Sequence, residues 1–256
     1  MVPDSTFDLP RYLAALPLFQ EMEPVALRRL AAASQLRRFT RGDMVFRVGD
    51  RCAEFHVAVF GQVKLFALSA GGQEKVLELA GPGMSFGEAP MFVGGHHRVN
   101  AQALADTLLL AVGKQAVLDE IALDPGFALR MLAGLSHRLH RLMDDVEAYS
   151  LHSGMRRVAD YLLRELETIG PAAEAVALPV SKATIALRLS LTPEYFSRVL
   201  HQLESEGLIG IHKRAIRIYS PKCLSAHAQL EPDAPAPPCP CKVCVRGPVQ
   251  RAAATA

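Results

Sequence analysis

The chain has 256 residues, half of them apolar, and a formal net charge of only +2, so we expect two domains and, for any phosphate ligand, a local basic patch. No apolar run approaches the roughly 20 residues of a membrane span, and the N-terminus lacks the basic and apolar regions of a signal peptide. Five cysteines, three of them crowded near the C-terminus, do not form an extracellular disulfide pattern, so we expect a cytoplasmic protein without a membrane partner.

Residues 1–123 predict a few short helices followed by a β-rich domain. Amphipathic helical patterns lie between residues 7 and 34. From residue 39 to 112, short apolar runs alternate with glycine turns, and these runs are residues 44–48, 55–60, 63–68, 75–79 and 107–112. Many short strands separated by glycine turns favour an antiparallel barrel or roll.

Residues 124–152 predict one long helix, with Asp124 as its cap and Pro125 at its first position. Apolar side chains recur along it at alternating spacings of three and four. They are Leu132, Leu135, Leu139, Leu142, Val146 and Tyr149. Burial within a monomer is one explanation. The stripe is narrow, however, and fits the 3.5-residue repeat of a two-stranded seam better than the broad face of a core helix, so we expect a homodimer.

Residues 153–230 predict a helical DNA-binding domain. Ser153-Gly154 interrupts the long helix at a point suited to a hinge. Further along, Ser181 caps a short helix that ends at Arg188, and Thr192 caps a second helix that starts at Pro193. Two short helices joined by a tight turn form the helix-turn-helix pattern. Beyond the second helix, apolar residues flank a basic turn over 208–219, which predicts a β-hairpin wing.

The second of these helices has one apolar face, and Glu194, Ser197 and Arg198 share the opposite face. Arginine can donate two hydrogen bonds to guanine, and glutamate can accept one from cytosine, so this face is suited to double-stranded DNA. Residues 181–222 hold seven Lys or Arg against three Glu, which supports the same conclusion; an ordinary amphipathic helix pair is the alternative. The expected phosphate contacts are Lys182, Arg188, Lys213, Arg214 and Arg217.

Residues 231–256 form a proline- and alanine-rich tail that we expect to be disordered. It contains Cys239, Cys241 and Cys244. Three thiolates within six residues are candidate ligands for an iron–sulfur cluster or for zinc, one short of the usual four, and an incidental tail is the alternative.

A β-roll, a long helix and a winged helix-turn-helix, in that order over about residues 12–225, resemble the Crp/Fnr superfamily of bacterial transcription regulators. The motif Glu194-x-x-Ser197-Arg198 looks like the Fnr-type recognition helix, whose Glu, Ser and Arg read a TTGAT half-site of an inverted repeat. The resemblance implies an α+β fold with a cyclic-nucleotide-binding-like β-roll, a dimerisation helix, a palindromic DNA operator and RNA polymerase as a partner.

Short segments, such as residues 72–79 and 135–140, are similar to the Dnr-like branch of that superfamily. Members of the branch control denitrification and nitric-oxide responses. The resemblance therefore implies control by oxygen, nitric oxide or redox state, in anaerobic or nitrogen-oxide metabolism.

Three kinds of effector remain open. Gly87-Glu88 and, ten residues later, Arg98 have the spacing of the Crp-type phosphate-binding cassette, which implies a cyclic nucleotide. Residues 99–101 depart from that cassette, because the nucleotide binders have a small hydroxylic residue after the arginine. The second candidate is a cluster on the tail cysteines. The third is haem, implied by the Dnr-like branch, and its candidate ligands are His96, His97, His137, His140, His152 and Cys239.

The leading hypothesis is thus a homodimeric transcription regulator. A cyclic-nucleotide-responsive regulator, or a nucleotide-binding module without DNA activity, is the alternative. We expect no enzyme, because the chain contains no nucleophile elbow, P-loop, HExxH motif or paired catalytic carboxylates at a recognisable spacing.

Overall fold

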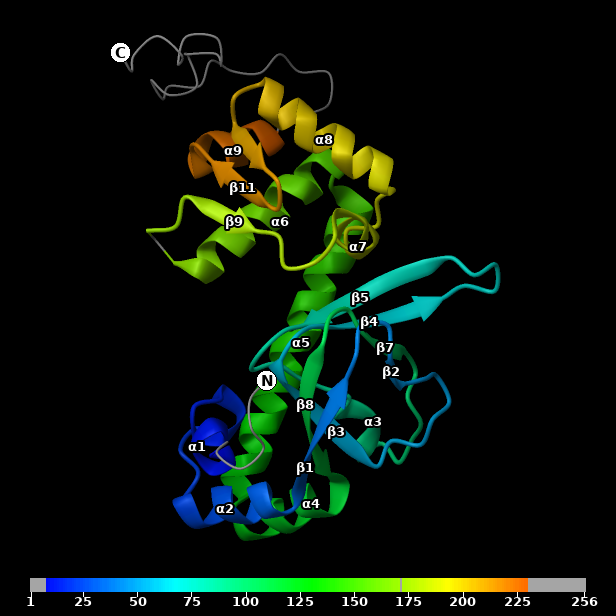
Figure 1. Cartoon of the computed structure of the whole chain (residues 1–256), viewed down its shortest axis with the longest axis vertical. Helices are drawn as coiled ribbons and strands as arrows, with labels where there is room; N and C mark the ends of the chain where they lie inside the picture. Colours follow the sequence, from blue (N-terminus) through cyan, green and yellow to red (C-terminus); the bar gives the residue numbers. More distant parts are fainter. Residues whose placement is uncertain (1–7, 171, 230–256) are drawn as a thin grey trace. The chain divides into compact units, whose positions relative to one another are not determined.

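The computed structural model describes residues 8–170 and 172–229, and the chain divides into two compact units, Met1–Leu142 and Met143–Ala256 (Figure 1). The boundary falls inside one long helix, and each unit is described by itself. The tail 231–256 and its three cysteines, Cys239, Cys241 and Cys244, lie outside the described residues. None of the helices that are described is long and apolar enough to span a bilayer.

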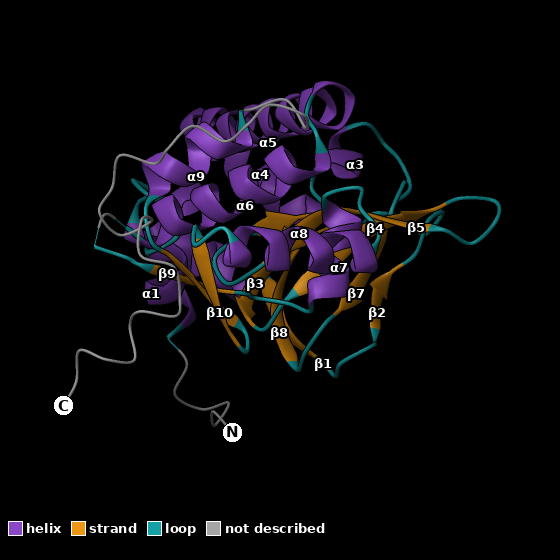
Figure 2. Ribbon diagram, turned by 90° about the horizontal axis from the view of Figure 1, so that it is seen from above, coloured by secondary structure: helices purple, strands orange, loops and turns teal. Residues whose placement is uncertain are grey.

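The first unit is a β-roll preceded by helices, as the glycine-punctuated pattern predicts. It opens with α1 (Leu9–Ala14), η1 (Pro17–Phe19) and α2 (Pro24–Ala32). Two antiparallel sheets follow, ordered β1-β8-β3-β6 and β2-β7-β4-β5. Figure 2 shows the strands in orange. The bounds of the first sheet are β1 Ser34–Phe39, β3 Glu54–Phe60, β6 Ser85–Phe86 and β8 Thr107–Gly113. Those of the second are β2 Met44–Phe46, β4 Val63–Leu68, β5 Glu74–Ala80 and β7 Asn100–Ala103.

Two apolar clusters hold the roll together. One lies between the sheets and includes Phe46, Leu65, Phe86 and Leu109. The other packs the helices onto β3 and β8, and its buried members include Leu13, Leu30, Phe55, Leu110, Val117 and Phe127. Gly61 explains one of the glycine turns, because its φ is +86° and a Cβ there would lie 2.7 Å from Cα of Thr107.

The predicted long helix is confirmed as α5 (Pro125–Leu151), which follows α4 (Lys114–Leu123). Asp124 supports the start of α5, since its side chain accepts a hydrogen bond from the Gly126 N–H at 2.9 Å and one from Arg130. Phe127 and Met131 anchor the first turns of α5 in the core of the roll. Further along α5, most of the apolar side chains are exposed.

The second unit is a winged helix-turn-helix built on α6 (Gly154–Ile169). The helix pair is α7 (Lys182–Arg188) and α8 (Pro193–Ser205), and both predicted caps are confirmed. Ser181 accepts a hydrogen bond from the Thr184 N–H at 3.1 Å, and Thr192 accepts one from the Tyr195 N–H at 3.2 Å. The predicted wing is β10 (Ile209–His212) and β11 (Ala215–Ile218), to which the structure adds β9 (Ala175–Ala177) and α9 (Pro221–Ala228).

Candidate nucleic-acid interface and sensor site

The face of α8 opposite the core carries the three side chains that the sequence selects for base contacts. Phe196, Val199, Leu200 and Leu203 are buried on the other side of the helix. Glu194 and Arg198 are exposed, and Ser197 is half-buried. Within the part of the chain that the structure describes, neither Glu194 nor Arg198 forms an ion pair, so both charges remain available to a ligand.

The wing that follows α8 in the sequence carries three basic residues, and all three are exposed: Lys213, Arg214 and Arg217. Lys213 is at the hairpin turn, with a φ of +56°. Arg214 donates to the carbonyl oxygens of Leu178 and Pro179, each at 3.3 Å, and Arg217 pairs with Glu174. Lys182, at the start of α7, is half-buried. These side chains can supply positive charge to a phosphate backbone.

Arg188 is placed differently from the other expected phosphate contacts. Its Nη2 lies 2.6 Å from Oδ2 of Asp145, and its Nη1 donates to the hydroxyl of Tyr149 at 2.8 Å. That hydroxyl in turn donates to the carbonyl oxygen of Arg188 at 2.7 Å. Burial raises the pKa of Tyr149, which keeps the phenol protonated as a donor. The guanidinium of Arg188 therefore serves this network within the chain, unlike the exposed basic residues of the wing.

The same network changes the expectation for Tyr149, the last residue of the predicted seam. Its hydroxyl joins the end of α5 to the end of α7, and its ring lies 5.9 Å from the guanidinium carbon of Arg157. Arg157 also donates to the carbonyl oxygen of Leu189, in the turn between α7 and α8, at 2.7 Å. Tyr149 is therefore engaged within its own chain and holds the helix-turn-helix in position.

The other seam residues are largely uncovered. Leu132 and Leu139 are each 58% exposed and Val146 is 63% exposed, while Leu142 is exposed and Leu135 half-buried. A stripe of exposed leucine and valine is a typical protein–protein contact surface.

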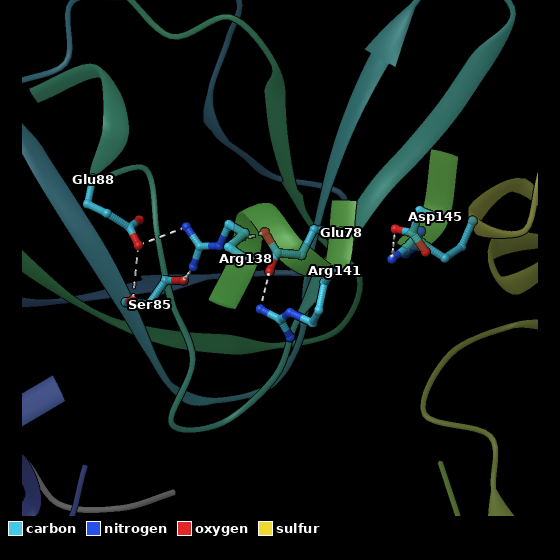
Figure 3. A network of polar contacts seen from close by, with 7 residues as sticks. Glu78, Ser85, Glu88, Arg138, Arg141 and Asp145 are labelled. Atoms are coloured by element: carbon cyan, nitrogen blue, oxygen red, sulfur yellow. Dashed lines mark hydrogen bonds and ion pairs between the residues drawn. The ribbon is translucent and has the colours of Figure 1, made fainter. Parts of the chain in front are cut away.

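Glu88, the acidic residue of the cassette in the β-roll, is buried, with 4% of its surface exposed. Its Oε1 accepts hydrogen bonds from Nη1 of Arg138 at 2.8 Å and from the hydroxyl of Ser85 at 3.3 Å (Figure 3). Arg138 comes from α5, donates also to the carbonyl oxygen of Ser85, and lies 3.3 Å from Oε2 of Glu78. Burial acts to lower the pKa of Arg138, but Glu78 and Glu88 outweigh it and raise that pKa, so the guanidinium stays charged.

Arg98 does not take part in this network. It is exposed, and no hydrogen bond or ion pair joins it to Glu88 or to any other residue that the structure describes. Gly87 precedes Glu88 with a φ of +83°, and a Cβ there would lie 3.4 Å from the ring of Phe46. The sequence spacing therefore predicts that Glu88 and Arg98 act in one site, whereas in the fold Glu88 pairs with Arg138.

Replacing Arg138 by alanine should destabilise the β-roll. The change leaves the buried Glu88 carboxylate without its charged partner, and we expect a loss of about 2–3 kcal/mol in the free energy of unfolding. Urea unfolding measures it. Arg141→Ala is the control: that arginine is 55% exposed and only 3.4 Å from Glu78, so we expect a loss below about 0.5 kcal/mol. Equal losses in the two variants would contradict this role for Arg138.

The histidines considered for haem do not gather at one site. His96, His137 and His140 are exposed, and His152 lies 3.5 Å from Asp160. His97 is buried and stacks on the ring of Phe46, with centroids 3.6 Å apart; burial lowers its pKa. Over residues 8–170 and 172–229, no three histidine, cysteine or acidic side chains come together as metal ligands. The described residues thus do not form a ligand set for a cluster, and no haem ligand stands out.

Comparison with known proteins finds a matching domain family for each unit and relatives that match across both units. Models of a cyclic nucleotide-binding domain and of a Crp-like helix-turn-helix domain match residues 36–124 and 156–226. The cyclic AMP receptor protein of Thermus thermophilus is 30% identical over 203 residues, which cover 79% of this chain and 92% of that protein. The CRP-like cAMP-activated global transcriptional regulator of Mycobacterium tuberculosis is 25% identical over 220 residues, 85% and 98% of the two chains.

Among solved structures, FixK2 from Bradyrhizobium japonicum matches with a TM-score of 0.68 and 25% identity. The match covers 75% of this chain and 95% of the FixK2 chain.

Proposed function

Since this chain belongs to the Crp/Fnr superfamily of transcription regulators, we propose that it acts as a homodimer on an inverted repeat of TTGAT-like half-sites. The observation that carries the proposal is the outer face of α8. There Glu194 and Arg198 are exposed, and neither forms an ion pair with the residues that the structure describes. Both lie near the N-terminus of α8, the part of the second helix that contacts bases in helix-turn-helix proteins.

Each side chain on this face has a chemical role in the proposal. Arg198 donates two hydrogen bonds to O6 and N7 of guanine, and Glu194 accepts one from the N4 amino group of cytosine. The hydroxyl of Ser197 contacts a base or a phosphate. Lys182 and the wing residues Lys213, Arg214 and Arg217 bind phosphates and set the register of the helix in the groove.

The dimer follows from the geometry of such an operator. Two half-sites one turn of DNA apart require two recognition helices about 34 Å apart, which a single chain cannot supply. The uncovered stripe on α5, with Leu132, Leu139 and Val146 all more than half exposed, is the proposed contact between the two chains. A regulator bound in this way would then recruit or exclude RNA polymerase.

For the signal, we propose control by oxygen, nitric oxide or redox state, in anaerobic or nitrogen-oxide metabolism. The Fnr-type motif and the Dnr-like segments favour this candidate. A cyclic nucleotide is the second candidate. Two relatives are named for cyclic AMP, which favours it, and the exposed Arg98 is available to a phosphate; the engagement of Glu88 by Arg138 counts against it.

A binding titration tests the proposal. The full-length protein, prepared without oxygen, is titrated with a TTGAT-N4-ATCAA duplex and with a scrambled duplex at one salt concentration. We expect binding to the repeat to be at least about 10³-fold tighter. Parallel titrations add nitric oxide, air or cyclic AMP. Tightening by cyclic AMP alone would favour the second candidate, and equal affinity for both duplexes in every condition would refute sequence-specific recognition.

Lys213 and Arg188 should respond differently in the same titration. Lys213→Ala removes one phosphate contact per half-site, so we expect the slope of log K against log salt to become shallower by about 1 per half-site. Arg188→Ala should leave that slope unchanged, because Asp145 and Tyr149 already hold its guanidinium. A shallower slope for Arg188→Ala would return this residue to the phosphate contacts.

A further inference from the structure

The first residue of α6 leaves no room for a side chain beside the recognition helix. A Cβ on Gly154 would lie 3.0 Å from both Cζ and the hydroxyl oxygen of Tyr195, and closer still to its Cε1. The φ of Gly154 is not in the left-handed region, so its backbone conformation is open to any residue. The feature that excludes a side chain at Gly154 is therefore the ring of Tyr195.

The same ring contacts the residue that is proposed to read guanine. Tyr195 and Arg198 are one turn apart on α8, and the guanidinium carbon of Arg198 lies 5.1 Å from the centroid of the ring. That distance is within the range of a cation–π interaction. Tyr195 is half-buried, and its hydroxyl has no hydrogen-bond partner among the residues that the structure describes. The ring thus meets Gly154 along its edge and Arg198 across its face.

An arginine on an exposed helix face has many rotamers, and ordering it on binding costs conformational entropy. A ring that already holds the guanidinium reduces that cost. The edge of the ring lies close to Gly154, so the ring cannot move further in that direction. A guanidinium that is already oriented loses less conformational entropy when it donates its two hydrogen bonds to guanine, so it binds the base more tightly than a freely rotating side chain does.

We propose that Tyr195 is a positioning residue for base recognition, and that its ring, held against Gly154, orients the guanidinium of Arg198 toward guanine. This inference rests on the base-reading role of Arg198 given above. It adds a specificity-determining residue whose own side chain reads no base, and it gives Gly154 a role besides that of the predicted hinge.

The test compares discrimination rather than affinity alone. The full-length protein and its variants are titrated with the TTGAT-N4-ATCAA duplex and with a duplex whose recognised guanines are replaced. The ratio of the two affinities is the readout. Tyr195→Leu keeps apolar bulk but removes the ring, and we expect a loss of discrimination of about 2- to 5-fold per half-site. Tyr195→Phe keeps the ring and should retain the wild-type ratio. Thermal melts check that each variant folds.

Gly154→Ala provides an independent variant, because it pushes the far end of the Tyr195 side chain and leaves Tyr195 and Arg198 in place. We expect it to reduce discrimination in the wild-type background and to have no further effect on the ratio in the Tyr195→Leu background. The slope of affinity against salt should stay the same in all of these variants, since no phosphate contact changes.

Three results would overturn the inference. If Tyr195→Phe is as defective as Tyr195→Leu, with equal losses of affinity on both duplexes, the hydroxyl of Tyr195 binds a phosphate instead. If Arg198→Ala abolishes discrimination while Tyr195→Leu and Gly154→Ala retain it, Arg198 needs no support from the ring. Should Arg198→Ala itself keep full discrimination, the proposed function fails, and the inference that rests on it fails too.

Discussion

Replacing Leu132 and Leu139 together by glutamate should convert the protein into a monomer. Both side chains are 58% exposed on α5, and in the proposed dimer the second chain removes them from water. Burial of a leucine contributes about 1.5–3 kcal/mol, and a symmetric contact loses four leucines in this double variant. Because each leucine has only the exposed part of its surface left to bury, the expected loss of dimer stability is about 3–7 kcal/mol, or roughly 10²- to 10⁵-fold in the dissociation constant.

Sedimentation velocity at micromolar concentration measures this change directly. His137→Glu is the matched control, since it places the same side chain on the same helix, at an exposed position roughly opposite the leucine stripe. The control should sediment as the wild type does. The double variant should also lose its affinity for the two-half-site duplex, while circular dichroism shows both units still folded. A double variant that sediments and binds DNA as the wild type does would place the dimer contact elsewhere.

The elements that the sequence predicts well are those that short-range interactions specify. The caps of α7 and α8 are hydrogen bonds to amides three residues away, so Ser181 and Thr192 mark the helix starts without knowledge of the fold. The five apolar runs of the roll agree with β2, β3, β4, β5 and β8 to within two residues. Each of these strands carries enough large apolar side chains to be recognised.

Other elements are stabilised by contacts that leave little local signal. In β7, the fully buried residues are Ala101 and Ala103, whose small side chains give a weak hydrophobic pattern. The edge strand β1 carries Arg37 and Arg38, which obscure the alternation of a strand. The start of α9 does have a local signal, because Ser220 followed by Pro221 is a typical helix start. In the structure Ser220 caps the helix by accepting a hydrogen bond from the Cys223 N–H.

The same distinction applies to the candidate sites. The residues of α8 share a helix, so their common face follows from spacing alone. The partner of Glu88, in contrast, is Arg138, 50 residues away, and the partner of Arg188 is Asp145, 43 residues away. Such pairs depend on how distant segments pack, and no spacing rule predicts them. Arg98 and Arg188 both fit their motifs by position. Only the fold shows that Glu88 pairs with Arg138 and that Arg188 pairs with Asp145.

Arg198→Ala should cause the largest loss of sequence preference of any single change on α8. A bidentate contact between arginine and guanine contributes about 1–3 kcal/mol per half-site, so two half-sites lose about 2–6 kcal/mol in total. The exposed guanidinium forms no ion pair within the described residues, so its removal should leave the fold intact. Affinity for the TTGAT-N4-ATCAA duplex should fall by roughly 30-fold to 10⁴-fold, and affinity for a duplex with altered guanines should change little.

His201→Ala is the control for this variant, because His201 is 70% exposed on the same helix, near its C-terminal end. Recognition helices contact bases mainly through their N-terminal residues, so His201→Ala should keep the wild-type preference. Arg198→Lys separates charge from geometry: lysine retains the positive charge but lacks the planar fork, so affinity should fall less than preference does. If Arg198→Ala binds both duplexes as the wild type does, the bases are read by other residues. A uniform loss on both duplexes would instead make Arg198 a phosphate contact, because only a contact to the base edge depends on which base is present.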